Sequence, residues 1–134
     1  MNANYISTNT TSLSAHQRRL SSVIYNLEAI IQKNPHETVE AQTIMFLLEV
    51  AGNETPVDLT YIGTKLGLSK AAASRNFYRL ADGRTGDTGL DLVKAVVDYK
   101  NRRRVSVELT PKGISLVQEL TTYLEKRVIN LKEH

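Results

Sequence analysis

Apolar residues recur at spacings of three and four in two long segments, one near each end of the chain. The first segment spans residues 12–33 and the second spans residues 111–131. This periodicity predicts two amphipathic helices, each with a single apolar stripe. The stripe positions are Leu13, Leu20, Ile24, Leu27 and Ile31 in the first helix and Val117, Leu120, Leu124, Val128 and Leu131 in the second. Residues 1–11 are polar and are expected to form a disordered tail.

Helix-capping residues indicate a further helix directly after the first. Asn34 is the expected N-cap, Pro35 suits the first helical position, and Glu37 closes a capping box. Gly52 is expected to end this helix, because glycine adopts the left-handed conformation that often terminates helices. The apolar stripe of this helix contains Val39, Thr43, Phe46, Leu47 and Val50.

Two short helices joined at a glycine are predicted between residues 58 and 81. Asp58 is the expected N-cap of the first helix and Ser69 that of the second. Gly67 permits the sharp turn between them. The positions expected to be buried at the crossing of the two helices are Ile62, Leu66, Leu68, Ala73, Phe77 and Leu80. This arrangement is typical of a helix-turn-helix.

Two β-rich runs follow, at residues 92–99 and 104–109. The apolar positions of the second run are Val105, Val107 and Leu109. They alternate with polar residues, which predicts a strand with one buried face. Residues 100–103 between the runs indicate a hairpin turn. The Gly-, Thr- and Asp-rich segment before them, from residue 83 to residue 89, is predicted to be a loop.

The elements therefore follow the order helix, helix, helix-turn-helix, β-hairpin, helix. The predicted fold class is mainly α with a small β-hairpin wing, a winged helix-turn-helix with an additional helix at each end. We expect a single winged-helix domain over residues 12–134. Within it, residues 58–110 form the helix-turn-helix and the wing.

The charge distribution adds a functional hypothesis, because the net charge of +3 conceals a marked asymmetry. Ten basic and four acidic residues lie between Lys65 and Arg104, which gives this stretch a net charge of +6, whereas the remainder carries −3. Positive charge concentrated in one third of a chain is typical of proteins that bind a polyanion. A solvated charged face without a partner would give the same pattern.

The second helix of a helix-turn-helix enters the DNA major groove, so the face opposite its apolar stripe is expected to contact DNA. The expected contacts are Ser69, Lys70, Ala71, Ala72, Ser74, Arg75, Tyr78 and Arg79. Arg75 is the expected base-contacting residue, because a guanidinium can bind guanine O6 and N7 together. Two packed helices with a solvated arginine-rich face are the alternative interpretation.

The hairpin turn carries a second cluster of expected DNA contacts. Its basic residues are Lys100, Arg102, Arg103 and Arg104. Consecutive arginines repel one another, so they contribute nothing to the stability of a turn. Inserting arginine into a narrow minor groove, where the negative potential is deepest, would account for them. A turn that is merely soluble is the alternative.

Residues 68–80 and 101–113 together resemble the MarR family of winged-helix transcriptional regulators. The matching positions are Leu68, Ser69, Ala72, Ala73, Ser74, Arg75, Arg79, Leu80, Asn101, Arg102, Arg103, Val107, Leu109, Thr110 and Gly113. The resemblance extends over nearly the whole chain, and the junction between the wing and the last helix is its more specific part. It implies a homodimer whose terminal helices intertwine and which binds a roughly palindromic operator.

The resemblance also implies residue roles. Its recognition-helix contacts are Ser69, Ala72, Ser74, Arg75 and Arg79, and its wing-tip arginine is Arg103. Asn101 stands where an acid usually opens the wing motif, which puts a salt bridge to Arg103 in doubt, although Asn can hold the turn through its side-chain hydrogen bonds. Residues 81–89 look like an insertion without an assigned role. Many relatives respond to small ligands, but no cluster here identifies an effector.

Other functional classes lack the residues that they need. The chain has no Cys, which excludes thiolate metal sites and disulfides, and its three His residues have no metal-ligand spacing. No nucleophile triad or phosphate-binding glycine loop is present, so we expect neither an enzyme nor a cofactor. The N-terminus has no apolar run and no stretch is long enough to span a membrane, which predicts a cytoplasmic protein.

The sequence therefore predicts a sequence-specific double-stranded DNA-binding regulator, with repression as the expected action. A domain of this size has little core left to cover both terminal stripes, so we expect the stripes to bury each other across a two-fold axis in a homodimer. The alternative is a winged-helix module of plasmid or phage origin that acts in replication or partition, or that docks a protein partner.

Overall fold

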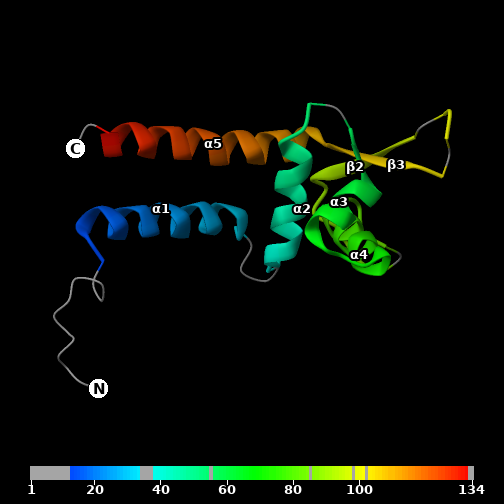
Figure 1. Cartoon of the computed structure of the whole chain (residues 1–134), viewed down its shortest axis with the longest axis horizontal. Coiled ribbons are helices and arrows are strands. Elements are labelled where there is room, and N and C mark those ends of the chain that lie inside the picture. The colour runs from blue at the N-terminus through cyan, green and yellow to red at the C-terminus, as the bar shows by residue number, and fades with distance from the viewer. Residues whose placement is uncertain are drawn as a thin grey trace, which may run out of the picture. The chain divides into compact units, whose positions relative to one another are not determined.

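A computed structural model describes most of the 134 residues of the chain (Figure 1). The described residues are 13–33, 38–54, 56–84, 86–97, 99–101 and 103–132, of which 128–132 are described in backbone only. Their elements are α1 (Ala15–Ile31), α2 (Ala41–Ala51), β1 (Val57–Asp58), α3 (Leu59–Leu66), α4 (Lys70–Leu80), β2 (Val93–Val97), β3 (Val105–Leu109) and α5 (Pro111–Lys132). The chain divides into two compact units, residues 36–119 and a helical unit that contains α1 and α5 from Leu120 onward.

The larger unit contains a three-stranded antiparallel sheet in the order β1-β3-β2. In the hairpin, Val93 pairs with Leu109 and Val97 with Val105. The strand β1 pairs Val57 with Val107. The hairpin was predicted, but β1 was not, since two residues are too short to show an alternating pattern. This short strand joins the start of α3 to the wing.

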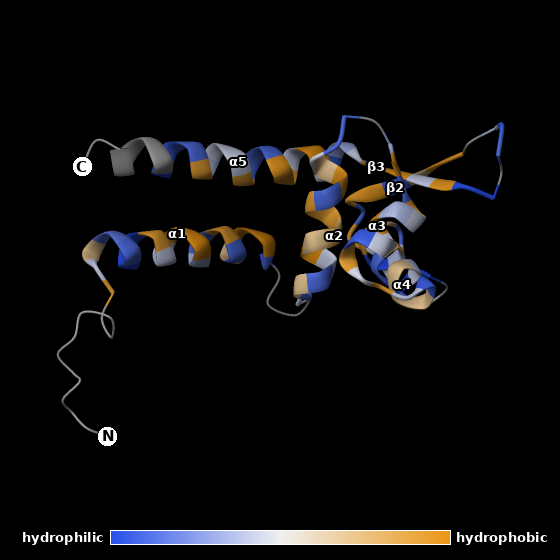
Figure 2. Ribbon diagram, viewed as in Figure 1, coloured by the Kyte–Doolittle hydropathy of each residue, from blue (hydrophilic) through white to orange (hydrophobic). Residues whose placement is uncertain are grey.

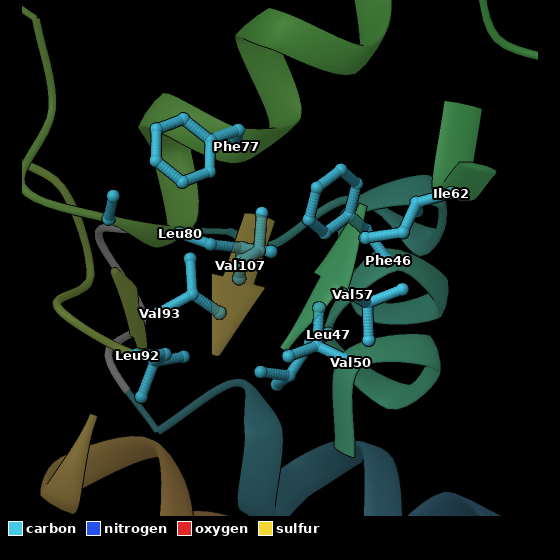
Figure 3. Close-up of a cluster of buried hydrophobic side chains, with 11 residues drawn as sticks. Phe46, Leu47, Val50, Val57, Ile62, Phe77, Leu80, Leu92, Val93 and Val107 are labelled. Carbon is cyan, nitrogen blue, oxygen red and sulfur yellow. The ribbon is translucent and has the colours of Figure 1, made fainter. Parts of the chain in front are cut away.

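The hydrophobic core of this unit lies among α2, α3, α4 and the sheet (Figure 3). Its buried residues are Phe46, Leu47, Val50, Val57, Ile62, Phe77, Leu80, Ala81, Leu92, Val93 and Val107. The predicted stripe of α2 is confirmed as buried, although Val39 precedes the helix. At the helix crossing, Ile62, Ala73, Phe77 and Leu80 are buried as predicted, whereas Leu66 and Leu68 are only half-buried.

The predicted ends of α2 need two corrections. The helix begins at Ala41 after Glu40, whose backbone is extended, and residues 38–40 are not helical. The capping residues proposed for an earlier start, Asn34, Pro35 and Glu37, lie outside the described residues. Gly52 does end the helix, but with φ −79° in the right-handed region. A left-handed cap is not needed there, because the Gly52 N–H still donates to the Leu48 carbonyl.

The expectation that Val105 is buried is wrong in part. Val107 is fully buried, but Val105 keeps 38% of its surface exposed. Its partner across the hairpin, Val97, is 61% exposed. Both residues lie next to the turn, where the hairpin extends past the core, so alternation alone predicts burial only for the half of the hairpin that the helices cover.

The helix-turn-helix is capped as the sequence predicts. The Asp58 carboxylate accepts the backbone N–H groups of Thr60 and Tyr61 at the start of α3. Gly67 ends α3 in the left-handed conformation with φ 68°, which glycine adopts without steric cost. The Ser69 hydroxyl then accepts the N–H of Ala72 and starts α4. These caps fix where each helix begins and the angle at which they cross.

The start of α5 explains the last motif of the sequence. The Thr110 hydroxyl accepts the Gly113 N–H at 3.0 Å and donates to the Asp91 carbonyl at 2.7 Å. A Cβ atom at Gly113 would collide with the carbonyl oxygen of Leu92. Only glycine therefore allows the first turn of α5 to pack against the chain entering β2.

The helical unit begins with a capping box, in which Ser14 and Gln17 exchange hydrogen bonds with each other's backbone. The side chain of Asn26 on α1 donates to the hydroxyl of Tyr123 on α5 at 2.9 Å. Apolar residues recur along α1 (Figure 2), yet none of its side chains is buried. Among the described residues, no helix is both long and apolar enough to cross a membrane.

The close approach at Gly113 predicts a large effect of a single methyl group. Gly113→Ala should lower the free energy of unfolding by at least about 1–3 kcal/mol, because the new Cβ meets backbone that cannot move aside. Urea unfolding followed by circular dichroism measures the loss. The control is Gly52→Ala, whose Cβ would have its nearest contact at 3.4 Å and whose φ suits alanine, so that the change stays within about 1 kcal/mol. Equal effects of the two substitutions would contradict this packing.

Candidate nucleic-acid interface

The helix α4 has one buried and one accessible face, as predicted. Ala73, Phe77 and Leu80 are buried on one side. The predicted contacts divide into Ser69, Lys70, Ala71, Arg75 and Tyr78, which are exposed, and Ala72, Ser74 and Arg79, which are half-buried. We call the surface formed by Ser74, Arg75, Tyr78 and Arg79 the α4 face. The structure thus places these four residues along one side of α4, opposite its buried residues.

A buried polar pair, which was not predicted, fixes α4 against α2. The Thr43 hydroxyl donates to Asn76 Oδ1 at 2.6 Å, and both residues are buried. Asn76 Nδ2 in turn donates to the Ala72 carbonyl at 2.9 Å. The spacing of Ala73, Asn76 and Phe77 could have revealed this position, because it completes the i, i+3, i+4 pattern of a buried stripe. The pair sets the rotation of α4 and therefore which residues form the α4 face.

The segment after α4 was predicted to be a loop without an assigned role, and the structure gives it one. Its backbone N–H groups satisfy the carbonyl groups that a helix leaves unpaired at its C-terminus. Gly83 donates to Tyr78, Leu90 to Arg79, and Leu92 to Leu80, at 2.7–2.9 Å. The loop therefore caps α4.

The same loop places a basic side chain on the α4 face. Nη2 of Arg84 donates to the Ser74 hydroxyl at 2.8 Å. Its guanidinium also lies over the Tyr78 ring, 4.5 Å from the centroid. Arg75, Tyr78, Arg79 and Arg84 line a common hollow together with Asp87 of the loop. No sequence pattern indicated Arg84, because a loop has no periodicity.

The wing turn is organised by Asn101. Its side-chain oxygen accepts the Arg103 N–H at 3.2 Å, and its carbonyl accepts the Arg104 N–H at 3.0 Å. This confirms the expectation that Asn can hold the turn without a salt bridge. The side chains of Lys100 and Arg103 are exposed, whereas Arg102 lies outside the described residues. The hairpin therefore presents cations at its end.

Arg104 differs from its neighbours because it has an acidic partner. Its Nε lies 2.8 Å from Oδ2 of Asp58, the residue that caps α3 through its other oxygen. The Arg104 side chain is still 58% exposed. The role of Arg104 as a DNA contact stays a prediction, while the geometry gives it a second role in joining the wing to the helix-turn-helix.

A further ion pair joins α2 to α3. Lys65 Nζ lies 2.6 Å from Glu49 Oε1. Hydrogen bonding to this carboxylate raises the pKa of the Lys65 amine above its ordinary value. Lys65 therefore stays charged through neutral pH, and on the alkaline side the pair is lost as the pH rises through that raised pKa.

The described residues contain no group of three or more His, Asp and Glu side chains that could hold a metal ion. His16 lies on α1, and His36 and His134 are outside the described residues. The expected lack of a metal or cofactor stays a prediction.

Solved structures share this arrangement. Rv1404 from Mycobacterium tuberculosis is 21% identical, with a TM-score of 0.66 over 87% of this chain and 71% of that chain. The MepR F27L mutant of S. aureus, crystallised bound to an oligodeoxyribonucleotide, is 18% identical, with a TM-score of 0.66 over 87% and 79%. MarR is 19% identical, with a TM-score of 0.54 over 88% and 81%.

The chain has a MarR-like winged-helix fold. This confirms the predicted fold class, including the additional helix at each end of the winged helix. No family model matches the chain, and no curated protein is significantly similar to it in sequence. Because these sequence identities are low, the similarity to MarR lies in the three-dimensional arrangement of the helices and strands.

The buried polar pair predicts a stability effect that sequence periodicity would not suggest. Thr43→Val keeps the side-chain shape but leaves Asn76 Oδ1 without its donor. We expect a loss of about 1–3 kcal/mol in the free energy of unfolding, measured by urea titration. The control is Thr64→Val at an exposed position of α3, where the expected change stays within about 0.5 kcal/mol. A neutral Thr43→Val would show that the hydrogen bond contributes nothing net.

Proposed function

We propose that the chain is a transcriptional regulator that binds duplex DNA as a homodimer, through α4 and the β2–β3 wing. The observation that carries this proposal is the α4 face, an accessible and strongly basic surface on the second helix of a helix-turn-helix. Its cations Arg75 and Arg79 have no hydrogen-bond or ion-pair partner for their side chains among the described residues. Such a surface suits phosphates and base edges.

The chemistry of the α4 face fits the major groove. Arg75 is exposed in the middle of the face, where its planar group can bind the O6 and N7 acceptors of guanine. Ala71 and Ala72 add little bulk at the start of the helix, so its backbone can approach the bases. Ser69, Lys70 and Arg79 are suited to phosphate oxygens.

The wing supplies the second contact. Arg103 is exposed beside the ordered Asn101 turn, where it can enter the minor groove and its negative potential. Lys100 and Arg102 extend this cationic end in the proposal. A minor groove encodes little sequence, so the wing contributes affinity while α4 contributes specificity.

The terminal helices support the homodimer. Leu13, Leu20, Ile24 and Leu124 are 58%, 38%, 68% and 40% exposed in the single chain. Large apolar side chains exposed together favour burial against a second copy. Of the remaining predicted contacts, Leu27 and Val117 are half-buried, Leu120 is already buried within the chain, and the side chain of Leu131 is outside the described residues.

The similarity to MepR, which was crystallised bound to an oligodeoxyribonucleotide, also favours DNA as the partner. A transcriptional regulator must reach the DNA, so a cytoplasmic location is part of this proposal. Repression remains the expected action. No described feature identifies an effector. A protein-docking winged helix is disfavoured, because such a module would present apolar residues where the α4 face presents arginine.

The two contacting parts predict different losses of affinity. Arg75→Ala should cost about 1–3 kcal/mol per site on a specific operator and much less on random duplex, since it removes a base contact. Arg103→Ala should weaken both together and lower the slope of log affinity against log salt by about one unit per site. Selection from random duplexes supplies the operator, and fluorescence anisotropy at several salt concentrations measures both effects. Wild-type protein without salt-dependent affinity for any duplex would refute DNA binding.

The homodimer is tested separately. Leu124→Asp should dissociate it, because an unpaired carboxylate at an apolar interface is costly. Light scattering at micromolar concentration measures the mass. Thr122→Asp, at an exposed position of the same helix, is the matched control and should leave the dimer intact. A wild-type protein that is monomeric at this concentration contradicts the assembly and leaves the DNA contacts to be tested on their own.

A further inference from the structure

The loop between α4 and β2 forms part of the α4 face. The loop begins at Ala81, directly after the helix. The side chain of its Arg84 contacts Ser74 and Tyr78 of that helix. Ser74 and Tyr78 are one helical turn apart, so a single side chain can contact both. Arg84 therefore contacts two of the residues that were expected to bind DNA.

The loop that carries Arg84 is tightly closed by its own backbone. A Cβ atom at Gly83 would collide with the carbonyl oxygen of Asp87, and one at Gly89 would collide with that of Ala81. Gly83 has φ 85°, a conformation that other residues rarely adopt. The Asp87 N–H also donates to the Arg84 carbonyl at 2.8 Å. The loop backbone therefore fixes the direction from which Arg84 approaches the helix.

The contacts of Arg84 leave most of its donors available. A guanidinium carries five N–H groups, and the Ser74 hydroxyl accepts from one nitrogen, Nη2. Arg84 has no acidic partner among the described residues: the loop acid Asp87 lines the same hollow but forms no ion pair with it. Stacking on Tyr78 orients the planar group without using its donors. An arginine held in this way has already lost much of the conformational freedom that binding would otherwise cost.

We propose that Arg84 is a DNA-contacting residue of the α4 face, and that Ser74 and Tyr78 are positioning residues that hold it. This inference rests on the proposed function. The ligand is a hydrogen-bond acceptor of duplex DNA, supplied by a guanine edge or by a phosphate. Arg84 thus adds a third guanidinium beside Arg75 and Arg79, from a segment outside the helix-turn-helix.

The test compares Arg84 variants on the selected operator and on random duplex of equal length. Arg84→Ala should weaken operator binding at least about fivefold, the lower end of the effect of one bidentate contact. A base-edge contact makes the loss on the operator exceed that on random duplex. A phosphate contact makes the two losses equal and lowers the salt slope by about one unit per site. Lys112→Ala removes one exposed cation elsewhere and is the matched control, with a change of less than about twofold expected.

The positioning roles need a second measurement. Tyr78→Ala should weaken binding, and Tyr78→Phe should restore most of the affinity, since it keeps the ring under the guanidinium. The double variant Tyr78→Ala, Arg84→Ala should bind no more weakly than Arg84→Ala alone, because the two residues act through one contact. Additive losses would overturn the positioning role. Unchanged thermal unfolding of each variant excludes a folding defect as the cause.

The outcomes separate this inference from the proposed function. If the wild-type protein binds no duplex, both proposals fail. If it binds and Arg84→Ala binds equally well, the DNA-contacting role of Arg84 is wrong and the proposed function stands. Tighter binding by Arg84→Ala also overturns it, because it would show that Arg84 masks the α4 face.

Discussion

The hydrogen bonds that close the C-terminal end of α4 are the constraint on which the rest of the larger unit depends. The chain turns back after the helix and pairs its N–H groups with the last helical carbonyls, including Leu92 with Leu80. The carbonyl of Leu92 then accepts the N–H of Thr110. One short stretch of backbone thus connects α4, the entry to β2 and the start of α5. The positions of the wing and of α4 follow from this connection.

The sequence predicted the fold because its strongest signals are local. Caps at Asp58 and Ser69, the left-handed Gly67 and the apolar stripes each depend on a few neighbouring residues, and the structure has them in place. Apart from the ends of α2, the errors occur where distant segments decide the outcome. Burial of Val105 depends on how far the helices reach along the hairpin, and the two-residue β1 exists only because β3 is beside it.

Only the part of the candidate site that lies on the helix α4 could be predicted from periodicity. The accessible arc around Arg75 follows from the rotation per residue, and it agrees with the structure. Asn76 was missed because its side chain is polar, although the spacing of the buried stripe of α4 includes its position. Arg84 could not be found from the sequence, since its contacts with α4 depend on the closed path of a loop that no pattern specifies.

In the closed loop between α4 and β2, the residues that determine the backbone path differ from the residue that presents its side chain beside α4. Its path depends on Gly83 and Gly89, where no side chain fits, whereas the side chain at position 84 contacts α4. A substitution at position 84 can therefore change the chemistry presented beside α4 while the scaffold stays intact. In evolution or in engineering, such a site offers a way to vary this surface in small steps on an unchanged backbone.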